Sequence, residues 1–139
     1  MLNTIKNKTG TNTWEIDTDG AGPVKLTGST PNETTHHTAA TSAADGTDAI
    51  VTGLSDLGLV LTGTSTSRTW KFWISVDGTT FTPVMGYNFE TGTLAVSSPG
   101  GSAATPESWA FSVKGAKKFR CELDAVAGGN ATAISEAVA

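Results

Sequence analysis

The stretch Thr-Trp-Lys-Phe-Trp-Ile-Ser-Val-Asp-Gly-Thr-Thr-Phe at residues 69–81 most constrains what this chain can fold into. Apolar side chains recur there at every second position, and an extended backbone places them on one face. These residues are Trp70, Phe72, Ile74 and Val76. The glycine in Asp77-Gly78 suits a tight turn that needs a positive φ. Because the chain is apolar again from Phe81, the stretch predicts a β-hairpin with one aromatic, inward face.

The same alternation of apolar and polar residues recurs at 57–61, 109–113 and 119–123. Turn-forming residues separate these stretches, and residues 131–138 are suited to a closing strand. No segment combines sustained helical periodicity with helix caps. Roughly eight to ten short strands, spaced about ten residues apart, predict an all-β fold. We expect an antiparallel β-sandwich with a jelly-roll-like strand order.

A chain of 139 residues is long enough to bury a real core in one domain. Residues 14–139 are predicted to form that single β-sandwich domain. Residues 1–13 are polar with few apolar anchors, so they are predicted to form a flexible N-terminal arm. Within the polar segment 28–47, His36 and His37 are expected on a solvated loop or extended strand. Adjacent histidines on a strand point to opposite faces, so we do not expect them to chelate a metal together.

The net charge and the single cysteine limit which partners and which cellular compartment are expected for this protein. A formal net charge of −4 gives no basic field for nucleic acid. The N-terminus lacks an apolar signal-peptide core, and no apolar run approaches the roughly 18 residues of a membrane span. Cys121 is in phase with Phe119 and Leu123, which predicts a small buried hydrophobe rather than a nucleophile. A chain without disulfides fits synthesis in a reducing host cytoplasm.

No arrangement of residues in the sequence points to catalysis. Nucleophilic chemistry needs a serine or cysteine beside a positioned base, yet the two histidines are neighbours in a polar segment. Phosphate-binding glycine loops and Cys/His metal spacings are missing from the sequence. We therefore expect a protein that is not an enzyme and that has no catalytic, cofactor-binding or metal-binding residues.

Three groups of residues are candidate contacts with a partner. Trp73, with Lys71 beside it, is expected to face away from the core. Three interpretations stay open: a second layer covers it, it anchors a protein interface, or it stacks on a sugar. The basic residues around the turn after residue 113 form a solvated turn or meet an acidic partner. They are Lys114, Lys117, Lys118 and Arg120. Leu2 and Ile5 are the apolar residues with which the arm could clasp a neighbouring subunit by strand addition.

The order of motifs from Trp70 onward resembles that of β-sandwich proteins from tailed-phage virions, notably capsid decoration (cement) and head-fibre proteins. The resembling segments are the strand and Ser-x-Asp-Gly hairpin at 70–84, the Thr-Gly turn at 88–92, the Val-x-Gly turn into an arginine-bearing strand at 111–121, and the Gly-Gly turn at 128–132. They are spread over residues 70–132, about half of the chain.

The resemblance implies a non-enzymatic virion protein on the capsid surface, one that binds the assembled shell and stabilises it. Its expected partners are the major capsid protein and further copies of itself, with a trimer favoured. Two alternatives stay open. One is a carbohydrate- or receptor-binding head fibre that reads a host surface glycan through Trp73. The other is a tail or baseplate component with the same sandwich.

Overall fold

The computed structural model describes the backbone of residues 5–7 and 14–16, and residues 30–98 and 105–139 in full. The chain divides into two compact units, Met1–Thr30 and Pro31–Ala139. In the first unit β1 (Ile5–Asn7) pairs antiparallel with β2 (Trp14–Ile16). Leu2 and most of the predicted 1–13 arm lie outside the described residues, so the flexibility of the arm stays a prediction.

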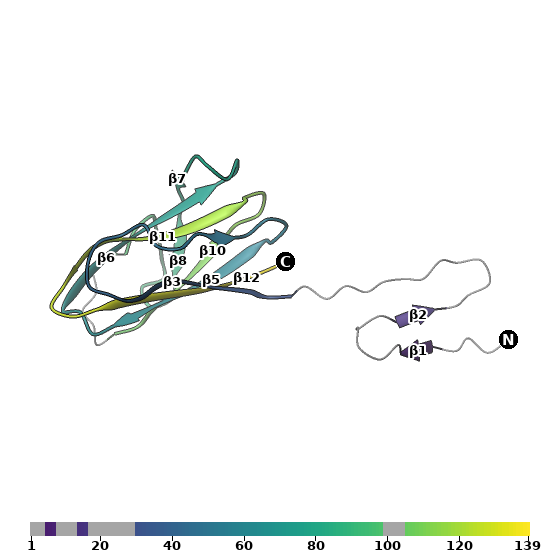
Figure 1. The fold of residues 1–139 in the computed structure, drawn as a ribbon, viewed down its shortest axis with the longest axis horizontal. Coiled ribbons are helices and arrows are strands. Elements are labelled where there is room, and N and C mark those ends of the chain that lie inside the picture. Colours follow the sequence, from purple (N-terminus) through teal and green to yellow (C-terminus); the bar gives the residue numbers. More distant parts are fainter. Residues whose placement is uncertain (1–4, 8–13, 17–29, 99–104) are drawn as a thin grey trace. The chain divides into compact units, whose positions relative to one another are not determined.

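The second unit is an antiparallel β-sandwich (Figure 1). Its six-stranded sheet has the order β3-β12-β5-β10-β8-β9, and its four-stranded sheet has the order β4-β11-β6-β7. The strands are β3 (Asn32–Ala40), β4 (Ala49–Ile50), β5 (Asp56–Gly63), β6 (Ser67–Ser75), β7 (Thr82–Pro83), β8 (Gly86–Asn88), β9 (Thr93–Ala95), β10 (Glu107–Ser112), β11 (Lys118–Ala127) and β12 (Ala131–Val138).

The strand order confirms the predicted jelly roll. The orders β3-β12-β5-β10 and β4-β11-β6-β7 are those of a two-sheet jelly roll, and the β8–β9 hairpin extends the first sheet beyond β10. The described residues contain no helix, and so none that is long and apolar enough to cross a membrane.

Aromatic side chains from both sheets form the centre of the core. The Phe72 ring lies 4.8 Å from the Trp109 ring and 4.9 Å from the Phe111 ring, measured between centroids. Phe111 in turn lies 4.8 Å from Phe119 on the opposite sheet. Each fully buried side chain of this size contributes roughly 1.5–3 kcal/mol to folding. The alternations at 57–61, 109–113 and 119–123 all bury their predicted residues, and Cys121 is buried with them.

The hairpin predicted at 69–85 is present, with its inward face shortened by one residue. β6 pairs with β7, and Gly78 in the connecting loop has a φ of 89°. The prediction for Val76 is wrong, because its side chain is 67% exposed. The strand ends at Ser75, whose buried hydroxyl accepts a hydrogen bond from the Gly78 N–H at 2.9 Å. The turn therefore begins before the alternation reaches Val76.

Of the expectation that His36 and His37 lie on a solvated loop or extended strand, the strand is confirmed and the exposure to solvent is wrong. His36 and His37 lie on β3, and both are buried. The register between β3 and β12 shifts here: Ala133 pairs with His37, but Ile134 pairs with Thr35. His36 is thus the extra residue of a β-bulge, which breaks the strict alternation of faces. Both rings enter the core, where His36 lies against Phe119 and His37 against Trp70.

Candidate binding surface

The outer face of the six-stranded sheet has a floor of small residues at its centre. Gly58 on β5 pairs with Ala110 on β10 and with Glu136 on β12. Leu57 and Leu59 on either side of Gly58 point into the core, so Gly58 faces outward. No atom lies within 4 Å of the position that a Cβ at Gly58 would occupy. The centre of this face is therefore open.

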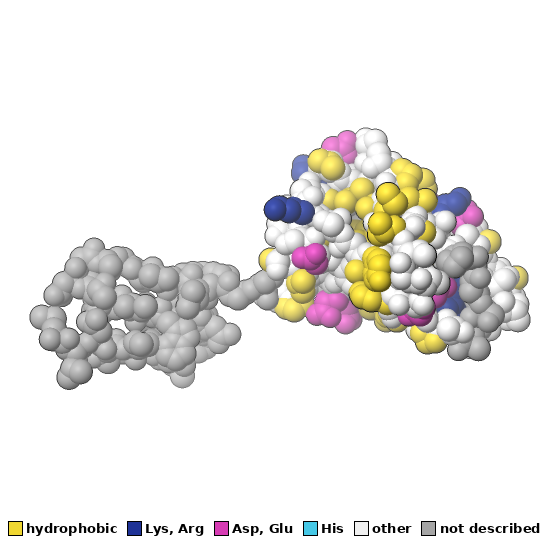
Figure 2. All heavy atoms as spheres, turned by 180° about the vertical axis from the view of Figure 1, so that it is seen from behind, with side chains coloured by type: hydrophobic (Ala, Val, Ile, Leu, Met, Phe, Trp, Pro, Cys, Tyr) yellow, Lys and Arg dark blue, Asp and Glu magenta, His cyan; other side chains and the backbone are white. Residues whose placement is uncertain are grey.

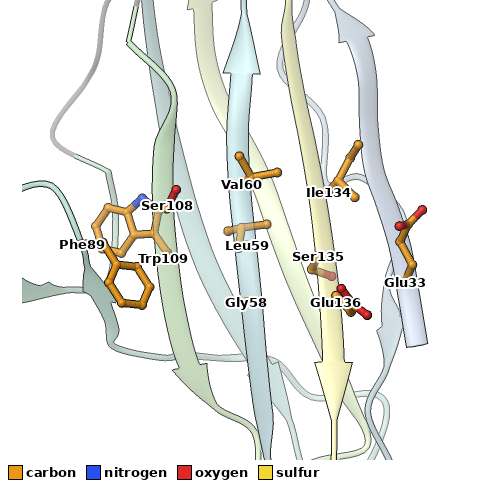
Figure 3. Close-up of a pocket in the computed structure, with 10 residues that line it drawn as sticks. All are labelled: Glu33, Gly58, Leu59, Val60, Phe89, Ser108, Trp109, Ile134, Ser135 and Glu136. Atoms are coloured by element: carbon orange, nitrogen blue, oxygen red, sulfur yellow. The ribbon is translucent and has the colours of Figure 1, made fainter. Parts of the chain in front are cut away.

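Large apolar side chains form one wall beside this floor. They are Met85 (59% exposed), Tyr87 (42%), Phe89 (60%) and Leu94 (64%). Two shallow hollows of about 390 and 450 Å³ lie against this wall, and both are lined by Gly58 and Phe89. We call the pair of hollows the sheet groove. Figure 3 shows the first hollow, with Phe89 on one side, Val60 on β5 in the middle, and Ile134 and Glu136 on β12 on the other side.

Exposed hydrophobic residues also gather in a band on the face of the sandwich unit shown in Figure 2. Single exposed apolar side chains are common on soluble proteins, but a contiguous patch marks a binding surface. The wall of the sheet groove forms such a patch, because Tyr87 pairs with Leu94 and Ala110 on the neighbouring strands and its ring contacts that of Phe89.

The segment that carries Phe89 is held in place by hydrogen bonds. The side-chain Oδ1 of buried Asn88 accepts hydrogen bonds from the backbone N–H groups of Glu90 and Thr91, at 2.9 and 3.0 Å. Both carboxylate oxygens of Glu90 accept the Ser108 N–H at 3.0 Å. Phe89 is thus presented on a fixed backbone, which lowers the entropy lost on binding.

Two glutamates flank the sheet groove on the side away from Phe89. Glu136 on β12 pairs directly with Glu33 on β3, and both side chains are exposed (Figure 3). Like charges in directly opposed positions of a sheet destabilise it. The six described strands of this sheet contain no lysine or arginine. This face is therefore apolar and acidic.

The predicted contact Trp73 lies on the other sheet and is partly buried. Its indole Nε1–H donates to Glu122 Oε2 at 2.6 Å. Lys71 beside it donates to Asp124 Oδ1 at 2.6 Å, and this hydrogen bond raises the pKa of the lysine. The polar tips of both residues are therefore satisfied within the fold. Their role as contacts stays a prediction.

The predicted basic cluster is divided by the structure. Lys118 and Arg120 point to Asp48, at 3.5 and 2.7 Å, and Arg120 also pairs with Asp45 at 3.0 Å. The Arg120 guanidinium lies over the Phe81 ring, 3.9 Å from its centroid. Burial opposes ionisation of Asp48, but the hydrogen bonds and charge of Arg120 outweigh it and lower the pKa of Asp48.

Lys114 and Lys117 are exposed on the turn before β11 and form no ion pair with the described residues. Ile5 is in β1, where its backbone pairs with Ile16. The structure therefore brings Lys71, Trp73 and Lys118 onto the outer face of the β6–β11 pair, where Arg120 is directly opposite Trp73, and leaves Lys114 and Lys117 on the turn before β11.

The buried titratable groups are unsuited to surface chemistry. Burial lowers the pKa of His36 to about 4, and it raises the pKa of the Cys121 thiol. Within the described ranges, no group of three or more His, Cys, Asp or Glu side chains is placed to hold a metal ion.

The sheet groove was missed in the sequence, although one signal pointed to it. The run Leu57-Gly58-Leu59-Val60-Leu61 is apolar in both phases of the alternation. A strand that is apolar on both faces is typical of a sheet covered on both sides. Here Leu57, Leu59 and Leu61 fill the core, and Val60 lies on the outer face.

Comparison with known proteins identifies a family and two crystal structures that this chain resembles. The model of the XepA family matches residues 30–137. A crystal structure described as SPBc2 prophage-derived protein YomS has 29% sequence identity and a TM-score of 0.71, and the match covers 84% of this chain and 99% of YomS. A crystal structure described as PBSX exported protein XepA has 26% identity and a TM-score of 0.76.

The match to XepA covers 100% of this chain but 49% of the XepA protein, so the chain spans about half of that relative. Comparison with curated proteins gave no significant match. The likeness to prophage proteins makes this a phage-related protein with a β-sandwich fold. The family match extends over most of the sandwich unit, and the chain belongs to the XepA family.

Proposed function

We propose that this chain is a non-enzymatic phage protein that acts by binding a protein surface through the sheet groove. The observation that carries the proposal is the difference between the outer faces of the two sheets. On the four-stranded sheet the described charged side chains are largely paired with one another. On the six-stranded sheet, rigidly held aromatic and aliphatic side chains face solvent around an open floor.

The sheet groove has the features of a protein-binding hot spot. Exposed aromatic residues that fill or flank a hollow are the side chains that most often contribute binding energy. Phe89 and Tyr87 supply two such rings, which contact each other edge to face at 5.5 Å. Covering them removes apolar area from water at roughly 25 cal/mol per Å² before the costs of association.

The target that we propose is the assembled phage capsid. A protein that binds only the assembled lattice stabilises that state by mass action. Several copies bound as a homo-oligomer would increase the overall affinity without any new kind of contact. This proposal is supported by the jelly-roll fold, the relation to prophage proteins and the exposed groove.

A second target is favoured by the description of XepA as an exported protein. If this chain shares that property, its groove binds a surface outside the cytoplasm rather than a capsid. Fractionation of a phage-producing culture separates the two targets. A capsid-bound protein bands with the particles, whereas an exported protein is recovered from the medium or the cell envelope.

Sedimentation of the purified protein with capsids that lack it tests the capsid proposal. We expect the wild-type protein to sediment with the capsids and Phe89→Ser to lose most of that binding. Val76→Ser is the matched control, because Val76 is a similarly exposed apolar residue, 67% against 60%, outside the groove. Equal loss from both variants, or no loss from Phe89→Ser, would show that the groove is not the contact.

A further inference from the structure

The unpaired acidic side chains beside the sheet groove point to the chemistry of its partner. Glu33 and Glu136 occupy directly opposed positions on β3 and β12. Neither carboxylate forms an ion pair or hydrogen bond with the described residues. At that separation two like charges repel each other, and no lysine or arginine of the described residues is paired with either carboxylate to offset the repulsion.

The distribution of positive charge makes this acidic pair distinctive. Lys71, Lys118 and Arg120 are all paired with carboxylates on the four-stranded sheet. Because the six described strands that form the groove face carry no basic residue, a complementary cation has to come from outside these strands.

The register places the acidic pair at a fixed distance from the apolar wall. Tyr87 pairs with Ala110, Ala110 with Gly58, and Gly58 with Glu136, so these residues lie in one row across the sheet. Neighbouring strands are about 4.8 Å apart, which puts Tyr87 and Glu136 about 14 Å from each other. An extended peptide spans that distance in about four residues.

We propose that the sheet groove binds an extended, apolar segment of a partner protein that carries a lysine or arginine about four residues from its apolar anchor. The anchor packs against Phe89 and Tyr87 above the open floor at Gly58. The basic side chain lies between Glu33 and Glu136 and removes their mutual repulsion. This inference rests on the proposed function, because it names the partner of the same groove.

A second copy of this chain is the competing occupant. A two-fold contact through this face would bring acidic pairs from both copies to one interface, which like-charge repulsion opposes. Sedimentation velocity tests this occupant directly. A dimer that Phe89→Ser dissociates would overturn the proposal in favour of self-association, and a chain whose association state does not depend on Phe89 would support it.

Titration of the ¹⁵N-labelled full chain with synthetic peptides tests the charge requirement. One peptide of about 12 residues alternates valine with serine and carries one lysine four residues from a valine, so that valine and lysine face the same side of the extended chain; its counterpart carries glutamate in place of that lysine. We expect the lysine peptide to shift amide signals of β5, β8, β10 and β12, and the glutamate peptide to cause no such shifts. Equal binding of both peptides, binding of neither, or shifts confined to the four-stranded sheet would overturn the proposal.

The double variant Glu33→Gln/Glu136→Gln tests whether these two carboxylates are the ones that contact the lysine of the peptide. It should weaken binding of the lysine peptide about tenfold or more, whereas Asp45→Asn/Asp124→Asn should leave it unchanged. The control removes the same charge from exposed carboxylates away from the groove, Asp124 on β11 and Asp45 in the loop before β4. If Phe89→Ser abolishes capsid binding but the Glu33/Glu136 variant retains it, the charge inference fails and the proposed function stands.

Discussion

At the scale of single residues, His36 shows how the core fixes a protonation state. Its Nδ1 lies 2.7 Å from the Thr47 carbonyl oxygen, which can only accept, so Nδ1 carries the proton. Nε2 is then the acceptor for the Ser135 hydroxyl at 2.8 Å. The ring is neutral, and a second proton on Nε2 would force the Ser135 hydroxyl to turn from donor to acceptor. Burial is the main cause of its pKa of about 4.

This histidine predicts a loss of stability in mild acid. In the unfolded chain a histidine has a pKa near 6.5, so between about pH 6.5 and 4 the unfolded state binds a proton that the folded state excludes. The free energy of unfolding should be constant above that window and fall by about 3 kcal/mol as the pH drops through it. Burial lowers the pKa of His37 as well, which adds to the fall.

Urea unfolding at a series of pH values measures the effect. The His36→Gln variant should be less stable at pH 7 but should show a smaller slope between pH 6.5 and 4. A slope equal to that of the wild-type protein would mean that His36 does not cause the acid sensitivity.

Two glycines on neighbouring parts of the same sheet predict opposite responses to alanine. A Cβ at Gly86 would overlap the Phe111 ring, so Gly86→Ala should destabilise the fold by about 1–3 kcal/mol through displacement of that ring. A Cβ at Gly58 meets no atom within 4 Å, so Gly58→Ala should change stability by at most about 0.5 kcal/mol. Denaturant midpoints of the two variants check this; equal midpoints would contradict the close packing of β8 on the core.

At the scale of elements, period-two alternation predicted the strands and the buried side of most of them. It was wrong where a local feature breaks the period. At His36 a bulge inserts one residue into β3, and at Val76 the strand has already ended. The bulge has no pattern in the sequence, because it is set by pairing with β12, a strand far along the chain. The turn at Asp77-Gly78 was recognised, but the alternation does not show that the strand already ends at Ser75. The apolar outer face of the six-stranded sheet was missed for the same reason as the bulge. The pairing of strands that are distant in the sequence decides which exposed apolar side chains lie next to one another.

The opposed pair on β3 and β12 predicts that a single substitution stabilises the sheet. Glu136→Gln removes the repulsion with Glu33 and leaves the packing of the neighbouring buried residues unchanged, so it should raise stability by about 0.2–1 kcal/mol. The gain should shrink in high salt, which screens exposed charges. Thermal unfolding at low and high salt measures both effects, and a loss of stability at low salt would show that the pair does not repel.

At the scale of the whole molecule, the two sheets carry different surfaces. The four-stranded sheet pairs its charges within the fold, whereas the six-stranded sheet leaves apolar side chains and carboxylates unpaired. The alternation of apolar and polar residues predicted the fold class, the net charge predicted the lack of a basic field, and the resemblance predicted a phage protein. They could not locate the binding face, because Gly58, Tyr87 and Phe89 come together only through the order β5-β10-β8.

The central claim is that this protein binds through the sheet groove, and filling the groove tests it most directly. Gly58→Gln places a side chain in the open floor, and Ala125→Gln places the same side chain on an exposed position of β11 on the other sheet. Both variants should keep a wild-type unfolding midpoint. With phage particles or the envelope fraction, whichever retains the wild-type protein, Gly58→Gln should bind at least tenfold more weakly and Ala125→Gln as wild type. Wild-type affinity of a folded Gly58→Gln variant would contradict the account.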